Sequence, residues 1–217
     1  MSKRVKIKFC GMRTKEALEY AIELGVNYLG FVIDFPKSPR SIPLPEFLKT
    51  SEWLKKNKKG KYKIVAVTVD MPIKNIQIII DSGYVDVIQL HGNENIGLIK
   101  KIKGIEVWKA WDSKSQGDVF EIGKSVDRIL LDSGNAVEKA QNTSGSFNAF
   151  SLYKDFKKKK INTVLSGGID SSNVNEYLEK LTPEIIDVSR GIETSPGKKS
   201  KRKMKEFINT VNVFYGK

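Results

Sequence analysis

The most constraining feature of this chain is the regular alternation of short apolar runs with amphipathic, helix-like segments. Eight such pairs follow one another at a spacing of roughly 25 to 30 residues, which matches repeated strand–helix units. Continuous apolar strands are typical of parallel sheets covered on both faces, and short right-handed crossovers connect them. Eight units favour closure into a (β/α)8 barrel, the TIM-barrel α/β fold, over an open doubly wound sheet.

The strand pattern occurs at residues 5–11, 26–33, 62–70, 85–92, 106–112, 128–134, 162–168 and 184–191. The helix pattern occurs at residues 14–25, 46–60, 73–83, 94–104, 117–125, 147–160, 171–181 and 198–216. Residues 34–45 form a proline-rich loop between the second strand and its helix. No linker or change of composition divides the chain, so we expect one barrel domain over residues 1–217.

Composition excludes several classes of protein. The 217 residues lie near the lower end of the usual length of such barrels. The apolar runs are too short to span a bilayer, and the N-terminus has no apolar signal region, so we expect a cytoplasmic protein that contacts no membrane. A single cysteine, Cys10, excludes an internal disulfide, and one histidine makes a zinc site unfavourable. We therefore expect no metal.

The formal net charge of +13 raises the alternative of a nucleic-acid-binding protein on a barrel scaffold. The basic residues are spread over four clusters, at 55–63, 100–103, 157–160 and 198–205, on predicted polar helix faces and helix ends. No aromatic-interleaved basic stripe or binding motif accompanies them. The spread of the charge therefore favours a solvated basic surface, whose positive field attracts anionic metabolites. We expect no specific nucleic-acid partner.

Two strands near the C-terminus end in small residues, in the sequences VLSGGID at 164–170 and DVSRGIE at 187–193. Small residues at a strand end let backbone N–H groups approach a ligand closely. In many (β/α)8 barrels the loops after strands 7 and 8 together hold a phosphate group. These two segments therefore indicate an enzyme that acts on a phosphorylated small molecule.

Polar residues stand at the ends of the other strands, where the active site of such a barrel forms. They are Cys10, Arg40, Asp70, Gln89, His91, Asp112, Asp132, Ser166, Asp187, Ser189 and Arg190. A thiol, carboxylates, an arginine and a phosphate cradle at one mouth suit acid–base chemistry on a sugar phosphate.

The same residues carry a family resemblance. KFCGMRT, GVNYLGFVIDFPKSPRSI, VDVIQLHGNE, ILLDSG, VLSGGI and DVSRGIETSPGKKS are similar, in this order, to the landmarks of the phosphoribosylanthranilate isomerases of tryptophan biosynthesis. The resemblance runs from about residue 5 to the last helix. It implies a cofactor-free Amadori rearrangement of a phosphoribosyl substrate, an aminoaldose, to an aminoketose.

The resemblance also implies roles. Cys10 is similar to the family's general base and Asp132 to its general acid. Arg40 matches the residue that holds the anthranilate carboxylate, for which its planar fork suits a two-point contact. A further set matches substrate- and phosphate-binding positions: Gln89, His91 and Asp187 for the substrate, and Gly167, Gly168, Ser189, Arg190 and Gly191 for the phosphate.

The implied chemistry sets requirements on the two groups. Asp132 must protonate the furanose oxygen, which requires a raised carboxyl pKa. Cys10 must take a proton from the sugar carbon, which requires a thiol pKa lowered toward neutrality. A nearby helix N-terminus and the positive charge of Arg13 are candidates for lowering the thiol pKa.

One region departs from the family. NTSGSFNAF at 142–150 is shorter than the usual glycine-rich stretch and lacks a tryptophan, with Asn148 and Ala149 in place of the acidic and indole positions. Asn148 still suits a helix N-cap. The departure concerns substrate contacts of the sixth loop.

Structural alternatives stand beside each assignment. Cys10 alone is typical of a buried apolar filler, Asp132 of a turn, and Arg40 of a solvated loop. His91 is more typical of a hydrogen-bonded structural histidine than of an acid or base. Asp70 and Asp112 are expected to be turn or capping residues, Lys198 and Lys199 a solvated flank of the last helix, and Trp53, Trp108 and Trp111 packing residues.

A rival function keeps the fold and changes the substrate. Isomerases of the histidine pathway act on a related aminoaldose, but they pair two aspartates and carry a two-fold repeat with two phosphate cradles. Here Cys10 stands on the first strand, and no glycine cradle follows the third and fourth. Sequence leaves the oligomeric state open between monomer and homodimer.

Overall fold

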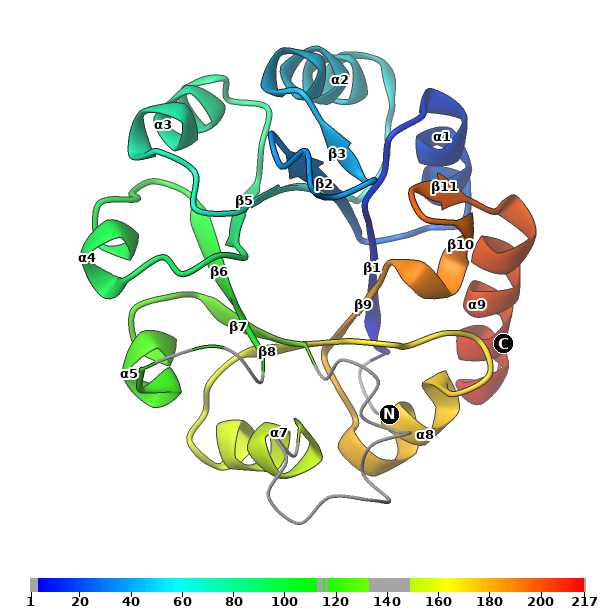
Figure 1. Cartoon of the computed structure of the whole chain (residues 1–217). Coiled ribbons are helices and arrows are strands. Elements are labelled where there is room, and N and C mark those ends of the chain that lie inside the picture. The colour runs from blue at the N-terminus through cyan, green and yellow to red at the C-terminus, as the bar shows by residue number, and fades with distance from the viewer. Residues whose placement is uncertain (1–3, 113–114, 116, 133–148, 217) are drawn as a thin grey trace.

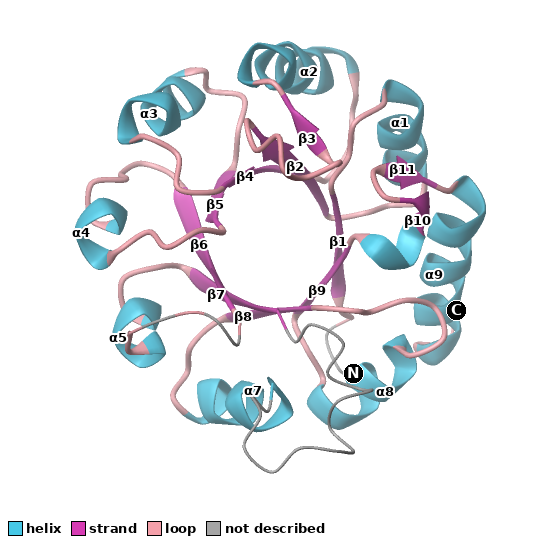
Figure 2. Ribbon diagram, in the orientation of Figure 1, coloured by secondary structure: helices cyan, strands magenta, loops and turns pink. Residues whose placement is uncertain are grey.

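The computed structural model describes residues 4–112, 115, 117–132 and 149–216. Eight parallel strands form a closed ring with the helices outside it (Figures 1 and 2). The ring consists of β1 (Lys6–Cys10), β2 (Tyr28–Ile33), β4 (Lys63–Thr68), β5 (Val87–Leu90), β6 (Glu106–Trp111), β7 (Arg128–Asp132), β8 (Thr163–Ser166) and β9 (Ile185–Val188). Pairing of β1 with both β2 and β9 closes it. The predicted (β/α)8 barrel is confirmed.

The helices follow the strands in the predicted order. They are α1 (Lys15–Glu23), α2 (Leu44–Asn57), α3 (Ile73–Asp81), α4 (Ile96–Ile99), α5 (Val119–Gly123), α7 (Ala149–Lys158), α8 (Val174–Leu181) and α9 (Lys201–Phe214). Local signals explain their bounds. In α1, the Thr14 side chain accepts a hydrogen bond from the Ala17 N–H at 3.3 Å. Gly25, with φ of +74°, ends the same helix.

Three details differ from the sequence prediction. Helix α4 is a single turn: the Asn95 side chain caps its start by accepting from the Leu98 N–H at 3.0 Å, and residues 100–104 that follow it are not helical. A two-residue strand, β3 (Ser41–Ile42), pairs with β2 inside the predicted loop. The last helix begins at residue 201, because β10 (Glu193–Ser195) and β11 (Lys198–Lys199) form an antiparallel hairpin before it.

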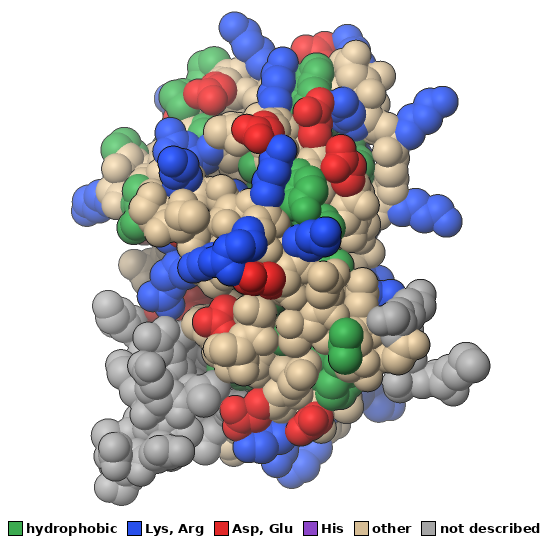
Figure 3. Space-filling view, turned by 90° about the vertical axis from the view of Figure 1, so that its right-hand side faces the viewer, with side chains coloured by type: hydrophobic (Ala, Val, Ile, Leu, Met, Phe, Trp, Pro, Cys, Tyr) green, Lys and Arg blue, Asp and Glu red, His purple; other side chains and the backbone are tan. Residues whose placement is uncertain are grey.

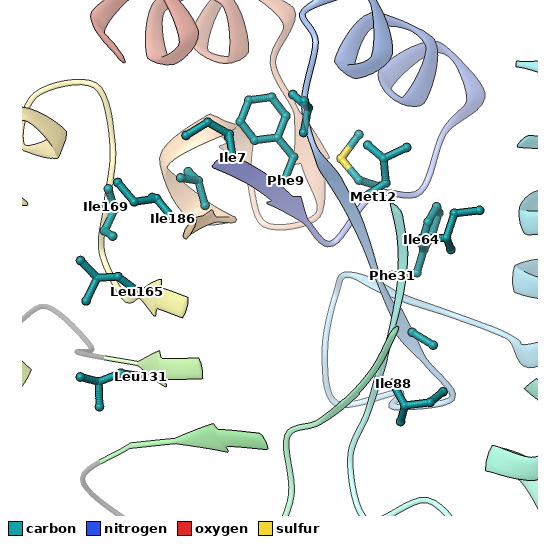
Figure 4. Close-up of a cluster of buried hydrophobic side chains, with 14 of the residues drawn as sticks. Ile7, Phe9, Met12, Phe31, Ile64, Ile88, Leu131, Leu165, Ile169 and Ile186 are labelled. Atoms are coloured by element: carbon teal, nitrogen blue, oxygen red, sulfur yellow. The ribbon is translucent and has the colours of Figure 1, made fainter. Parts of the chain in front are cut away.

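Apolar side chains pack on both faces of the strands. One cluster fills the layer between barrel and helices, and includes Phe9, Phe31, Leu131 and Ile186 (Figure 4). A second cluster fills the barrel interior with residues from all eight strands: Cys10, Tyr28, Val65, Val67, Val87, Trp108, Ala110, Leu130, Val164 and Ile185. Trp108 is fully buried, with its ring centroid 5.2 Å from that of Tyr28. Two packed layers therefore hold the ring.

Charged side chains close the amino-terminal end of the barrel. Arg128 contacts Glu184 at 2.9 Å and Glu106 at 3.4 Å, and Lys63 contacts Glu106 at 2.6 Å. Tyr28 and Trp108 lie just above this ionic network, and Trp108 Nε1 donates a hydrogen bond to Glu106. In barrels of this class the amino-terminal end serves stability, whereas the opposite end carries the site. Within the described part of the chain, none of the helices is long and apolar enough to cross a membrane.

Candidate active site

The polar residues at the carboxyl ends of the strands share the interior face of the barrel. Leu130 and Ile185 belong to the interior cluster, and side chains two residues apart on a strand point to the same face. Asp132 and Asp187 therefore continue the interior face toward the carboxyl end. The charges of Asp132, Asp187, Lys8 and Lys109 all act on His91 of the loop after β5. Residues of β1, β7 and β9 thus surround one mouth.

Cys10 ends β1 beneath this mouth. Its side chain is buried and belongs to the interior cluster. Opposite it on β2 stands Gly30, where an added Cβ atom would lie 3.0 Å from the Cys10 sulfur. The absence of a side chain at Gly30 therefore makes the room that the thiol occupies.

The electrostatics of Cys10 differ from the sequence expectation. Burial raises the pKa of the Cys10 thiol above its ordinary value, although the positive charge of Lys8 lowers it. Lys199 also lowers the thiol pKa, whereas Asp187 raises it. Arg13 is not among the charges that act on the thiol, and its guanidinium donates instead to the Pro39 carbonyl at 2.9 Å. In this geometry burial outweighs the neighbouring positive charges, and Arg13, named as a candidate contributor, bonds elsewhere.

Lys8 and Asp187 form an ion pair inside the barrel wall. The Lys8 ammonium lies 3.0 Å from Oδ1 of Asp187, and their side chains are 0% and 6% exposed. The Ser166 hydroxyl lies 3.5 Å from the other carboxylate oxygen. Asp187, expected to orient substrate, is thus already held from below by a lysine of a neighbouring strand.

Gln89 fixes the orientation of His91. The Gln89 side-chain amide lies 3.0 Å from Nδ1 of the imidazole, a contact that fixes the plane of the ring. Burial lowers the pKa of His91 below its ordinary value, so the ring is neutral near neutral pH. The interpretation of His91 as a hydrogen-bonded histidine agrees with this contact.

Arg40 lies between β3 and the hairpin that follows β9. Its guanidinium donates to both oxygens of Glu193, with Nε 2.9 Å from Oε1 and Nη2 2.6 Å from Oε2. Lys199 donates to the same carboxylate at 2.8 Å and to the Ser189 carbonyl at 3.1 Å. Lys199 has a 3% exposed side chain, so its assignment as a solvated helix flank is wrong: the hairpin turns it inward. Arg40 is also no freely solvated loop charge.

The two glycine-containing strand ends lie side by side, since β8 pairs with β9. Gly167 and Gly168 have φ of +98° and +63°, a backbone region that favours glycine. The Asn173 side chain donates to the Gly168 carbonyl at 2.8 Å and holds this turn. A Cβ atom at Gly191 would overlap the Ile169 carbonyl oxygen, so the turn after β9, with Ser189 and Arg190, packs directly on the loop after β8.

Other predicted residues have structural roles or lie outside the described residues. The Asp70 carboxylate accepts from the Asn93 N–H at 2.6 Å, and Asp112 accepts from the Ser115 hydroxyl at 3.0 Å in its own turn. Asp112 has the expected turn role, whereas Asp70 joins the loop after β4 to the loop after β5. The departing segment that precedes α7, including Asn148, falls in residues 133–148, which the structure does not describe. Among the described residues, no cluster of three His, Cys, Asp or Glu side chains is arranged for a metal ion.

Comparison with known proteins identifies the family. The model of the family "N-(5'phosphoribosyl)anthranilate (PRA) isomerase" matches residues 7–210. The chain belongs to this isomerase family. An N-(5'-phosphoribosyl)anthranilate isomerase of Caldanaerobacter subterraneus subsp. tengcongensis is 37% identical over 95% of this chain and 98% of its own length. One from Sinorhizobium fredii is 32% identical over 96% and 93%.

Solved structures of the same family resemble this fold. The phosphoribosylanthranilate isomerase of Thermotoga maritima superposes with a TM-score of 0.78 at 29% identity, over 96% of this chain and 99% of that one. A phosphoribosylanthranilate isomerase in complex with reduced 1-(o-carboxyphenylamino)-1-deoxyribulose 5-phosphate gives 0.75 at 28% identity, with the same coverage. The family resemblance of the sequence is confirmed.

Sequence reasoning missed several residues of this isomerase's site. Three residues next to predicted site residues received no role: Lys8, Gly30 and Glu193. Lys199 received a wrong one. The signal for Lys8 was available, because a lysine two positions before Cys10 on the same strand must face the barrel interior. The signal for Glu193 was weaker, because its motif was noted but its partners lie far away in the chain.

Proposed function

We propose that this phosphoribosylanthranilate isomerase converts its aminoaldose substrate to the aminoketose of tryptophan biosynthesis with Cys10 as general base and Asp132 as general acid. The assignment is carried by one observation: the two side chains continue the same interior face at the carboxyl ends of β1 and β7. A thiol and a carboxyl group from separate strands can then reach one substrate from different sides of the mouth.

The substrate is oriented at its two charged ends. The turns at Gly167 and Gly168 and at Ser189, Arg190 and Gly191 receive the phosphate, which the positive-φ backbone and the close packing of the loops support. Arg40 receives the anthranilate carboxylate. Because Glu193 already occupies Nε and one N–H of Nη2 of Arg40, the substrate carboxylate is held through the remaining N–H groups of Nη1 and Nη2.

The reaction proceeds by proton transfers that open the ring and move a double bond. Asp132 donates a proton to the furanose oxygen, and the C–O bond opens to give a Schiff base. Cys10 then removes a proton from the neighbouring sugar carbon, and the electron pair of that C–H bond forms the enamine, which tautomerises to the ketone. His91, neutral and oriented by Gln89, lines the pocket, and Asp187 binds the substrate's reacting end.

Two substitutions test the roles. In Cys10→Ser and Asp132→Asn, kcat falls by orders of magnitude while substrate binding persists, because each group acts in the transition state. The measurement is the fluorescence decrease as the anthranilate substrate, generated in situ, is consumed. Asp112→Asn is the matched control, a carboxylate at the same rim that bonds within its own turn. Full activity in both test variants would exclude the assignment.

Compartment and partners stay predictions. A pathway enzyme of small-molecule biosynthesis is expected in the cytoplasm, which cell fractionation tests. On the face shown in Figure 3, basic side chains alternate with acidic ones. We therefore expect generic RNA to bind weakly and to dissociate at modest salt, with no specific nucleic-acid partner. One neighbour is described as "dimeric", with monomers generated from it; for this chain, sedimentation decides between monomer and homodimer.

A further inference from the structure

Lys8 is a fully buried cation within the barrel. Its side chain has 0% exposed surface, and an ammonium removed from water is costly unless an anion accompanies it. Asp187 supplies that anion at 3.0 Å. The pair lies directly below the predicted site, where an apolar residue would fill the same space at a lower cost in desolvation. The position of this charge therefore calls for a role besides packing.

The end of the Lys8 side chain and the Cys10 thiol both border the space beside Gly30. Both residues lie on β1, two positions apart, and both face Gly30 of β2. An added Cβ atom there would be 3.0 Å from Lys8 Cε and 3.0 Å from Cys10 Sγ. The charged groups that act on Cys10 are Lys8 of the same strand, Asp187 of β9 and Lys199 of β11. Strand β2 contributes a glycine, so no side chain separates Lys8 from the thiol on that side.

Lys8 and Lys199 are not equivalent. Lys199 is held by Glu193 and by the Ser189 carbonyl, which direct its ammonium into the hairpin. Lys8 is the strongest of the charges that favour the anionic sulfur. It is also the one that shares the interior face of the barrel with Cys10.

We propose that Lys8 is a positioning residue for Cys10: its ammonium, anchored by Asp187, supplies the positive charge that stabilises the sulfur anion during proton abstraction. The inference rests on the proposed role of Cys10 as base. Lys8 keeps its own proton throughout. The proton removed from the sugar carbon goes to the sulfur, and the C–H electron pair goes into the substrate.

Asp187 opposes Lys8 in this arrangement. The negative charge of Asp187 disfavours the Cys10 thiolate. The same charge also neutralises the Lys8 ammonium, which favours the thiolate. Removal of the two charges must therefore shift the thiol titration in opposite directions. A purely structural role for the Lys8–Asp187 pair predicts no such opposition, since either substitution would only loosen the barrel.

The test uses the fact that Cys10 is the chain's only cysteine. The rate of its alkylation by iodoacetamide, followed by mass spectrometry across pH, gives the midpoint of thiol ionisation. Lys8→Met moves this midpoint up by about one to two pH units, Lys8→Arg retains most of the native value, and Asp187→Asn moves it down. Lys6→Met is the matched control on the same strand, where the lysine pairs with Glu184 at 3.5 Å; its midpoint stays unchanged.

A double variant serves as the control for a folding defect in Lys8→Met. If Lys8→Met leaves Asp187 unpaired and unfolds, the Lys8→Met/Asp187→Asn protein removes both buried charges together. Its midpoint is compared with that of Asp187→Asn alone, and loss of Lys8 again raises it. Equal midpoints in these two proteins, or an equal rise in Lys6→Met, would overturn the proposal.

Turnover supplies a second readout. In Lys8→Met, kcat near neutral pH falls about tenfold, which corresponds to a shift of about one pKa unit, while KM changes little, and kcat recovers as pH rises. Failure of the two inferences is distinguishable. If the midpoint is shifted in Lys8→Met but Cys10→Ser keeps full activity, Cys10 is not the base, and Lys8 has no catalytic role through it. An inactive Cys10→Ser with an unshifted midpoint in Lys8→Met overturns the Lys8 proposal alone.

Discussion

Arg40 and Glu193 form a two-point ion pair that joins the loop after β2 to the hairpin after β9. The two donor–acceptor distances are 2.9 and 2.6 Å, between residues 153 positions apart in the chain. Because Lys199 shares the same carboxylate, one buried anion holds two cations next to the mouth. This relationship fixes the orientation of the Arg40 guanidinium, for which we propose contact with the substrate carboxylate.

Loss of the Glu193 charge destabilises the fold. In Glu193→Gln, Lys199 and Arg40 remain buried or partly buried without their anion, which costs about 3 kcal/mol of the free energy of unfolding. Urea denaturation at neutral pH measures the change. Glu176→Gln, which breaks an exposed pair with Lys180 on α8, serves as control and loses about 0.5 kcal/mol or less. Equal losses in both variants would contradict the prediction.

The contribution of Glu193 depends on pH in the acid range. Burial by itself raises the pKa of its carboxyl, but hydrogen bonds from Arg40 and Lys199 outweigh burial and leave the pKa below its ordinary value. A depressed folded-state pKa means that the stabilisation is fully present above the unfolded pKa and is lost as pH falls through the folded pKa. The difference in stability between native protein and Glu193→Gln should therefore shrink as the pH is lowered from neutral through about 4. Urea titrations at several pH values check it, and a constant difference would refute it.

An added methyl group at Gly30 should impair catalysis more than folding. The Gly30→Ala Cβ atom lies 3.0 Å from Cys10 Sγ and from Lys8 Cε, so both side chains must shift, at a cost of about 1–3 kcal/mol in stability. We expect kcat to fall about tenfold or more, because a small displacement of a catalytic group weakens transition-state contacts. Steady-state kinetics and thermal unfolding measure both effects. Gly97→Ala, whose Cβ atom would meet only Asn95 Oδ1 at 3.2 Å, should leave activity intact.

Gly191 should control binding of the phosphate end. In Gly191→Ala the new atom overlaps the Ile169 carbonyl oxygen, so the turn after β9 must move away from the loop after β8. The proposed phosphate cradle then widens. We expect KM to rise about tenfold, equivalent to about 1.4 kcal/mol of binding free energy, and inhibition by inorganic phosphate to weaken in parallel. An unchanged KM would show that the turn after β9 does not contribute to phosphate binding.

Substitution at the opposite end of the barrel should change stability alone. Arg128 contacts Glu184 and Glu106 at the amino-terminal end, and its side chain is 14% exposed. Arg128→Met leaves these carboxylates without their shared cation and should cost about 2 to 4 kcal/mol. Because the site lies at the carboxyl ends of the strands, kcat/KM should stay within about twofold at a temperature where the protein is folded. A large fall in kcat/KM would contradict this prediction and show that the amino-terminal end of the barrel affects the site at the carboxyl-terminal end.

The eight-strand barrel was predictable because it depends on periodicity along the chain. Apolar runs such as residues 62–70 and 128–134 predicted β4 and β7. Small residues at 167 and 168 predicted a strand end open to a ligand, and the structure gives both glycines a positive φ. Helix α4 was predicted too long at both ends: Glu94 accepts hydrogen bonds from the N–H groups of Asp70 and Gly92, which a local pattern does not contain, and residues 100–104 leave the helix. The hairpin at residues 193–199 was missed for a similar reason, since charged residues carry little strand signal.

By itself, the sequence determined the closed parallel barrel, the family and the side chains at its carboxyl rim, because hydrophobic spacing and short motifs are local properties. Only the tertiary structure decided the charges around those side chains. It paired Lys8 with Asp187, Arg40 and Lys199 with Glu193, and Gly30 with Cys10. Burial and charge at a point in space arise from residues that are remote in the chain, so the direction of the Cys10 pKa followed from folding and not from its motif.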